Sequence, residues 1–280
     1  MKAGIRIGLI VFILLFASMN FHLIVHHNSC RLVKRNAIAS NPRQSRDFKI
    51  ISYNVNDMPT AIFTNKRNRI SRLTSFLNEN KDSVDMFMFQ EVFTDFYRLK
   101  LIQFFKQLDW SVVYGDPSAN YWTFVHNGLF VASRYPFAHT EAINFRSCVM
   151  FDCFSKKGAL LVQVKKNKAL YTIVNTHLQD STFDINGATR SHQLKEIHEM
   201  GQKYETITVI GDINTTPSRL RDAAPYTYGI RLFGRAVFPA LPTFQKLTYD
   251  GAFGPLVTSV STLEPTSSIS DHRPILVTLN

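Results

Sequence analysis

Cysteine is scarce in this sequence, with three residues in 280, and none of them has the spacing of a structural zinc site. The chain also lacks a Gly-x-Ser-x-Gly motif, which argues against a serine hydrolase with a nucleophile elbow. Repeats and low-complexity segments are absent as well, so nothing indicates a repeat protein. At this length, one large globular domain or two small ones are expected.

Acidic residues are missing from the first 46 positions, which carry seven basic residues. Most of the net charge of +11 lies in this tail, so the rest of the chain is only mildly basic. An apolar run from Ile7 to Met19 follows Lys2 and Arg6 and resembles a secretory signal or a signal anchor. We therefore expect a secreted or membrane-anchored protein in three parts: a signal peptide or anchor (1–27), a basic linker (28–46) and one folded domain (47–280).

The export signal also bears on the cysteines. It would place the chain in an oxidising compartment, where Cys148 and Cys153 could form a disulfide. Two unpaired buried thiols fit the sequence equally well, so the pairing stays open.

Apolar runs and helical periodicity predict the elements of the domain. Strands are expected at residues 48–55, 86–89, 111–114, 128–133, 158–164, 170–175, 207–210 and 274–279. Helices are expected at 65–80, 94–108 and 188–204, and a long loop rich in Pro, Tyr and Phe at 215–243. Because many strands are adjacent in sequence, we expect sheets packed on each other with helices outside.

Polar residues capable of chemistry recur at the ends of the expected strands. In the clearest case, an apolar strand stops at Gly211, and Asp212 and Asn214 follow on one face. Similar residues stand at or beside other strand ends: Asn54, Glu91, His177, Asp271 and His272. Each has a plain alternative explanation, such as a helix N-terminal acid or a core histidine. So many coincidences in one chain favour a single site.

The residue types in this set indicate a particular chemistry. Carboxylate and amide oxygens suit a hard divalent cation such as Mg²⁺. Two histidines suit base and acid roles on opposite sides of a reacting centre. A cation that neutralises phosphoryl oxygens while a base activates water performs phosphoester hydrolysis.

Five ordered motifs resemble those of the endonuclease/exonuclease/phosphatase superfamily. They are Asn54, Gln90-Glu91, Asn175-Thr176-His177, Gly211-Asp212-Ile213-Asn214 and Ser270-Asp271-His272. The resemblance covers residues 48–280 and implies an α/β fold, a four-layer α/β sandwich of two mixed β-sheets packed face to face with helices outside. It also implies a phosphoester hydrolase that depends on Mg²⁺, with Mn²⁺ or another divalent cation as the alternative.

Further segments are similar to neutral sphingomyelinases: Gly128–Pro136, Ser155–Gly158, Thr176–Gln179 and Arg190–Leu194. This similarity implies hydrolysis of sphingomyelin, a membrane phospholipid, to ceramide and phosphocholine by a monomeric enzyme. The alternatives are a DNase-like endonuclease and a phosphatase acting on inositol lipids or other phosphomonoesters. The modest charge of the domain disfavours nucleic acid as the partner.

The roles of the superfamily carry over to matching positions of this chain. Glu91, Asn54 and Asp271 match residues that hold or neighbour the metal. Lys157 and Asn175 are the expected substrate-binding residues. For Lys157 the sequence offers a second reading, because Asp152 is close enough along the chain to neutralise it.

Five residues match catalytic positions. Asp212 and Asn214 match the pair that positions the attacking water and binds the phosphate, and His272 matches the general base. Asp250 lies where the superfamily has a carboxylate that orients this histidine. His177 matches a second histidine, which stabilises the phosphoryl transition state or protonates the leaving group.

Overall fold

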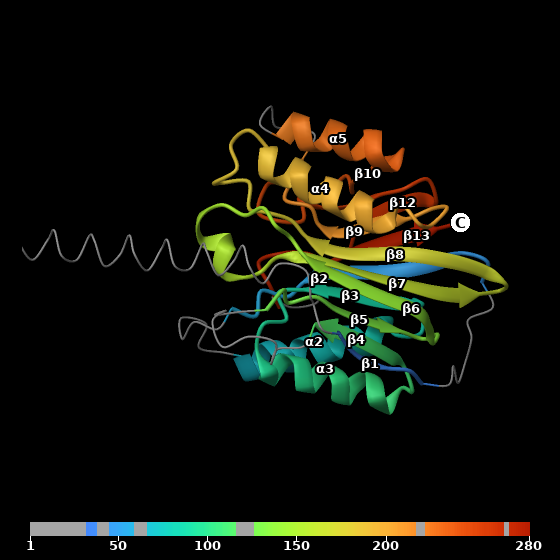
Figure 1. Cartoon of the computed structure of the whole chain (residues 1–280). Helices are drawn as coiled ribbons and strands as arrows, with labels where there is room; N and C mark the ends of the chain where they lie inside the picture. The colour runs from blue at the N-terminus through green and yellow to red at the C-terminus, as the bar shows by residue number, and fades with distance from the viewer. Residues whose placement is uncertain (1–31, 38–44, 59–65, 116–125, 217–221, 266–268) are drawn as a thin grey trace, which may run out of the picture.

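The computed structural model describes residues 32–37, 45–58, 66–115, 126–216, 222–265 and 269–280 of the chain. Within them, two β-sheets lie face to face and helices cover their outer sides (Figure 1). The α/β sandwich expected from the sequence is therefore confirmed.

The sheets have seven and six strands. The first has the order β1 (Leu32–Arg35), β4 (Ser111–Gly115), β5 (Phe130–Ser133), β3 (Met86–Gln90), β2 (Phe48–Asn54), β13 (Ile275–Leu279) and β12 (Val257–Thr262). The second has the order β10 (Ala236–Val237), β11 (Asp250–Phe253), β9 (Thr208–Asp212), β8 (Ala169–His177), β7 (Gly158–Lys166) and β6 (Phe137–Asn144). Both are mixed, because β2 pairs with β3 and β8 with β9 in parallel while the other named pairs are antiparallel.

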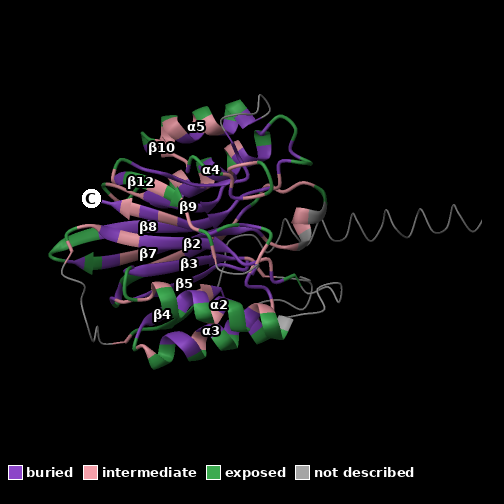
Figure 2. Ribbon diagram, turned by 180° about the vertical axis from the view of Figure 1, so that it is seen from behind, coloured by how far each residue is buried: buried purple, intermediate pink, exposed green. Residues whose placement is uncertain are grey.

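The helices divide between the two sheets. Apolar side chains of α2 (Lys66–Asn80) and α3 (Asp95–Gln107) pack on the first sheet, and those of α4 (Ala188–Gly201) and α5 (Ala223–Phe233) pack on the second. Figure 2 shows buried residues along the central strands and exposed residues on the outer sides of the helices. A short 3₁₀ turn, η2 (Met150–Phe154), precedes β7.

Strand alternation decides which side chains face the space between the sheets. In β2, Phe48 and Ile50 belong to the core between the sheets, whereas Ile51 and Tyr53 pack beneath the helices. Because successive side chains of a strand point to opposite faces, Asn54 follows Ile50 onto the inner face, at the last position of β2.

The same alternation operates in three more strands. Polar residues near their ends share a face with inner-core residues: Gln90 with Met88, His177 with Ile173, and Asp212 with Ile210. The register places Asn54 beside Gln90 and His177 beside Asp212. Strand ends from both sheets therefore present polar groups at one edge of the core.

Several sequence-based boundaries are wrong. Residues Leu32–Arg35, inside the predicted linker 28–46, form β1 and pair with β4, because an edge strand contributes backbone rather than an apolar pattern. The predicted loop 215–243 contains α5, whose Pro225, Gly229 and Phe233 are buried. The strands β6, β11 and β12 were not predicted, since their short or polar sequences carry little periodicity.

Cys148, just before η2, and Cys153, within η2, form a disulfide, with their Cα atoms 5.2 Å apart. The predicted signal segment 1–27 lies outside the described residues, as does Cys30. None of the helices within the described ranges is long and apolar enough to cross a bilayer.

Candidate active site

Polar side chains from both sheets meet at the edge where β2, β3, β8 and β9 end. Six of them are neighbours of one another and are called the polar cluster: Asn54, Glu91, His177, Asp212, Asp250 and His272. All six were proposed from the sequence as site residues. The structure brings these residues together although they are spread along the sequence from Asn54 to His272.

Asn54 joins the two sheets within the polar cluster. Its Nδ2 donates to Glu91 Oε1 at 2.9 Å and to Asp212 Oδ2 at 3.0 Å. Glu91 directly follows β3 of the first sheet, and Asp212 is the last residue of β9 in the second sheet. Asn54 Oδ1 accepts the backbone N–H of Asn56, so the amide is held at both ends. Glu91 has a positive φ of 58°, which non-glycine residues rarely adopt. One buried amide thus holds two carboxylates close together.

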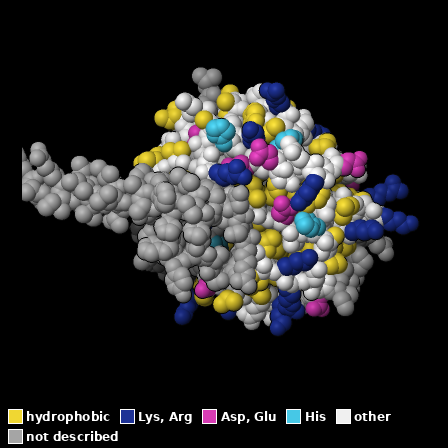
Figure 3. All heavy atoms as spheres, viewed as in Figure 1, with side chains coloured by type: hydrophobic (Ala, Val, Ile, Leu, Met, Phe, Trp, Pro, Cys, Tyr) yellow, Lys and Arg dark blue, Asp and Glu magenta, His cyan; other side chains and the backbone are white. Residues whose placement is uncertain are grey.

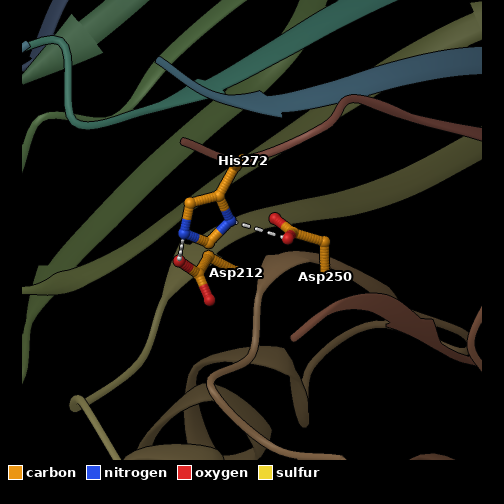
Figure 4. A group of neighbouring side chains, drawn as sticks. All are labelled: Asp212, Asp250 and His272. Atoms are coloured by element: carbon orange, nitrogen blue, oxygen red, sulfur yellow. Dashed lines mark hydrogen bonds and ion pairs between the residues drawn. The ribbon is translucent and has the colours of Figure 1, made fainter. Parts of the chain in front are cut away.

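His272 is held between two carboxylates. Its Nδ1 lies 2.8 Å from Asp250 Oδ2, and its Nε2 lies 3.7 Å from Asp212 Oδ2 (Figure 4). Asp250 stands directly opposite Asp212 in the pairing of β11 with β9. The isolated bridge between Phe244 and His272 adds backbone support, and the Phe244 ring lies 4.8 Å from the imidazole.

The electrostatics of the cluster follow from its burial. Burial opposes charge on His272, but the carboxylates of Asp250 and Asp212 outweigh it and raise the pKa of His272 to about 10. Burial raises the pKa of Glu91 and that of Asp212, because it penalises the ionised carboxyl. The cluster therefore holds carboxylates with too little compensating positive charge.

His177 approaches the same carboxylate oxygen of Asp212 as His272 does. His177 Nε2 is 3.4 Å from Asp212 Oδ2 and 3.0 Å from the ammonium of Lys157. Burial, together with the charges of Lys157 and His272, keeps the pKa of His177 well below its usual value. Because an ammonium can only donate, the neutral imidazole accepts through Nε2.

Lys157 pairs with Asp152, as the second reading of the sequence expected, and its contact with the substrate stays a prediction. Its Nζ reaches His177 in the polar cluster, and it also lies 2.9 Å from Asp152 Oδ2 and donates to Leu178 O at 2.7 Å. The side chain is buried. The lysine is thus next to the cluster and is held there by a carboxylate.

The two predicted asparagines occupy different settings. Asn214, with φ +49°, donates its backbone N–H to Asp212 Oδ1 and its Nδ2 to Leu178 O, so it is fixed beside the cluster. Asn175 is fully buried, and its amide bonds Gln90 Nε2, Phe89 O and Phe130 O. This side chain links the sheets beneath the cluster, which favours a positioning role over the substrate contact that was predicted.

Asp271 is exposed, unlike the members of the polar cluster. Its Oδ1 accepts from Ser270 Oγ at 3.2 Å. Its charge contributes to the raised pKa of Glu91 and of His272, so it lies within electrostatic reach of both. Its role as a metal neighbour stays a prediction.

The donor set fits a hard divalent cation. Asp212, Asp250 and His272 offer ligand atoms within 4.8 Å of one another, although the sequence favoured Glu91, Asn54 and Asp271. Asp212 and Asp250 are buried carboxylates, whereas Glu91 is partly buried, Asn54 offers an amide oxygen and Asp271 is exposed. A cation among these oxygens would offset the cost of burying the carboxylate charges. Asp250 Oδ1 is buried and has no hydrogen-bond partner among the described residues.

Supporting residues were harder to find from the sequence than the cluster itself. Arg190 is fully buried. Its Nη1 donates to Asn214 O at 2.5 Å and to Asp222 Oδ1 at 2.6 Å. Its Nε donates to Asp184 Oδ2 at 3.1 Å. In the sequence, Arg190 was only one residue of a family-like segment. An arginine at a helix start usually faces solvent, so its role depended on knowing which carboxylates surround it.

No family model matches the chain. Phospholipase C of Staphylococcus aureus is 25% identical over 209 residues, which cover 65% of this chain and 62% of that protein. The chain thus spans about three fifths of the length of the curated relatives it matches.

Solved structures decide the fold. An endonuclease/exonuclease/phosphatase from Bacteroides vulgatus matches with a TM-score of 0.65 at 17% identity, over 84% of this chain and 99% of that one. The chain has the endonuclease/exonuclease/phosphatase fold. Within this fold, a mutant of Staphylococcus aureus beta toxin with bound magnesium ions matches with a TM-score of 0.67 at 18% identity, over 84% of this chain and 100% of that one.

Sphingomyelinase C from Streptomyces griseocarneus also matches this endonuclease/exonuclease/phosphatase fold. Its TM-score is 0.65 at 16% identity, over 84% of this chain and 100% of that one. The similarity to the superfamily, and within it to sphingomyelinases, that the motifs suggested is confirmed.

Proposed function

We propose that the chain is a Mg²⁺-dependent phosphodiesterase that hydrolyses sphingomyelin to ceramide and phosphocholine. The observation that carries the proposal is the polar cluster, in which the His272–Asp250 pair lies together with Asn54, Glu91, His177 and Asp212. The similarity to proteins named phospholipase C and sphingomyelinase C supports a phospholipid as the substrate.

In this mechanism His272 is the general base. Its Nδ1 is engaged by Asp250, so Nε2 is the nitrogen that removes a proton from water. Asp212 lies 3.7 Å from this nitrogen and would orient the same water, with Asn214 beside it. A divalent cation held by Glu91 and Asn54, with Asp271 nearby, would neutralise the phosphoryl oxygens and disfavour the protonated form of His272.

Lys157 and His177 act on the opposite side of the reacting phosphorus. The ammonium of Lys157 is a donor for a phosphate oxygen, once it exchanges Asp152 for the substrate. His177 is neutral and its Nε2 accepts from Lys157 Nζ, so the proton for the leaving alkoxide would come from the Lys157 ammonium, directly or relayed through His177 Nε2. Water attack at phosphorus then breaks the bond to the ceramide oxygen, which leaves protonated.

We infer that the enzyme works outside the cell or on a membrane, secreted or anchored through residues 1–27. The Cys148–Cys153 disulfide supports an oxidising compartment. On the face shown in Figure 3, Lys and Arg side chains are spread among acidic and apolar ones, which gives no support there to a nucleic-acid track.

The test is hydrolysis of sphingomyelin vesicles by the full chain, with Mg²⁺ or with a chelator. Phosphocholine release should require the cation and should be lost in His272→Ala. The matched control is His139→Ala, because His139 pairs with Glu141 on β6, away from the polar cluster. Plasmid DNA and an inositol phospholipid run in parallel. Nicking of DNA, or phosphate release from the inositol lipid, without phosphocholine release would replace this proposal with the corresponding alternative.

A further inference from the structure

The segment Arg146–Asp152 runs from the end of β6 into η2 and lies between α4 and the loop after β8. At its base, Phe145 N–H donates to Lys157 O at 2.9 Å. Glu196 of α4 then accepts the backbone N–H of Arg146 through both carboxylate oxygens, at 3.2 and 3.1 Å. Figure 1 shows η2 at the same end of the molecule as the start of α4.

Two glutamines continue this attachment and are called the glutamine clasp, Gln179 and Gln193. Gln193 Nε2 donates to Ser147 O at 2.8 Å, and its Oε1 accepts the backbone N–H of Gln179 at 2.8 Å. Gln179 in turn accepts Val149 N–H at 2.9 Å and donates to Val149 O at 3.2 Å. Both side chains are fully buried. The clasp thus ties Ser147 and Val149 to the strand end that carries His177.

The clasped segment ends on the residue that holds Lys157. Asp152 Oδ2 accepts the backbone N–H of Asp180 at 2.6 Å and lies 2.9 Å from Lys157 Nζ. The same Nζ lies 3.0 Å from His177. The position of the Lys157 ammonium therefore depends on where η2 is placed.

We propose that Gln193 and Gln179 are positioning residues, which hold η2 so that Asp152 keeps the Lys157 ammonium beside His177. The effect of the two glutamines on turnover rests on the proposed phosphodiesterase function, whereas their effect on the position of Lys157 does not. Among the described residues, neither glutamine side chain is hydrogen-bonded to a member of the polar cluster.

The physical reason is the directionality of these bonds. Buried amide hydrogen bonds are strong where water is excluded, and they hold their partners at fixed distances. Removing the polar atoms of Gln193 leaves the buried Gln179 N–H and the partly buried Ser147 O without their partner. An unpaired polar group in a buried position costs free energy, so the segment would shift to let these groups bond to water. A shift of about 1 Å at a catalytic group can cost about 100-fold in rate.

The experiment measures the accessibility of Lys157 directly. The full chain is treated with an amine-reactive reagent, and modification of Lys157 is followed by peptide mass spectrometry. The variant is Gln193→Met, which keeps the length of the side chain and removes its polar atoms. We expect Lys157 to be modified several-fold faster than in the parent protein, and kcat on sphingomyelin to fall about 10-fold or more with a smaller change in KM.

The matched control is Gln163→Met. Gln163 is a partly buried glutamine whose Nε2 donates to Thr172 Oγ1 at 3.0 Å within the sheet, and it has no part in the clasp. We expect unchanged Lys157 labelling and unchanged kcat there. Equal labelling of Lys157 in parent, Gln193→Met and Gln163→Met would overturn the proposal.

Failure of the proposed function gives a different result. If the chain does not hydrolyse sphingomyelin, Lys157 labelling still reports on the clasp. If Gln193→Met does not fold, Gln193→Glu replaces it, because it keeps the acceptor for Gln179 N–H and loses only the donor to Ser147 O. Slow labelling of Lys157 in the folded Glu variant would equally reject the role of Gln193.

Discussion

His272 Nδ1 and Asp250 Oδ2 are 2.8 Å apart, and this contact decides which imidazole nitrogen faces Asp212. Asp250 comes from β11, a strand with no clear signal in the sequence. Its place opposite Asp212 follows from pairing with β9. The pair therefore depends on sheet register rather than on local sequence.

Asp250→Asn should impair turnover while leaving the protein folded. The amide keeps the shape but not the charge, so His272 loses the largest of its favourable carboxylate interactions and its pKa falls. The imidazole would also be free to adopt the wrong tautomer, and kcat should drop about 100-fold or more. The measurement is kcat against pH, with the acid limb displaced to lower pH. An unchanged profile would show that Asp250 does not orient His272.

Stability of the cation-free protein should fall as the pH rises. The folded-state pKa of Asp212 is raised to about 7, above its unfolded value, so its contribution is present at low pH and is lost as the pH rises through that value. His272 acts in the same direction, through a folded-state pKa of about 10. His177, whose pKa is lowered below 6.5, acts in the opposite direction below that pH, so Tm is compared from about pH 6.5 to about pH 9, where it should decline.

Mg²⁺ should reduce this decline, because a cation stabilises the ionised carboxylates that cost stability in its absence. Asp212→Asn provides the control, since it removes one of the titrations that lower stability as the pH rises. A cation-free Tm that rises over the same range would contradict the assigned burial of these charges.

Arg190→Met should destabilise the protein by about 3–5 kcal/mol, because it leaves Asp184 and Asp222 buried without their cation. The free energy of unfolding in urea measures the loss. Adding Asp222→Asn should recover part of it by removing one uncompensated charge. Arg231→Met is the matched control, since Arg231 is exposed and should change stability by less than about 0.5 kcal/mol.

Gly211→Ala should disrupt the strand that carries Asp212. A Cβ at this position would lie 2.0 Å from Thr176 O, and φ is +148°. The comparison is Gly234→Ala, where φ is +86° but no atom lies within 4 Å, so only the backbone cost of about 1–2 kcal/mol applies. Urea denaturation should show a larger loss for Gly211→Ala, together with lost activity. Equal losses would mean that β8 and β9 separate easily.

The sequence was informative where a strand pattern ends on a polar residue. Ile50 and Asn54 lie on one face of β2 because strand alternation is local, and the same holds for Ile210 and Asp212 in β9. Superfamily motifs extended this to His272 and Asp250. These assignments needed no knowledge of which strands are neighbours.

Other relationships depended on packing between distant segments. The sequence left the Cys148–Cys153 pairing open, missed α5, and assigned Asn175 to the substrate although its amide links the two sheets. Buried polar side chains find their partners only when both sheets and α4 are in place.

The sequence by itself indicated which residues could do chemistry and, where a strand pattern was clear, as for Asp212 in β9, on which face of the strand the side chain would lie. Only the tertiary structure decided that Asn54 bonds carboxylates of both sheets and that Gln193 reaches the segment before η2. The reason is that strand periodicity acts over a few residues, whereas sheet pairing and helix docking join residues far apart in the chain.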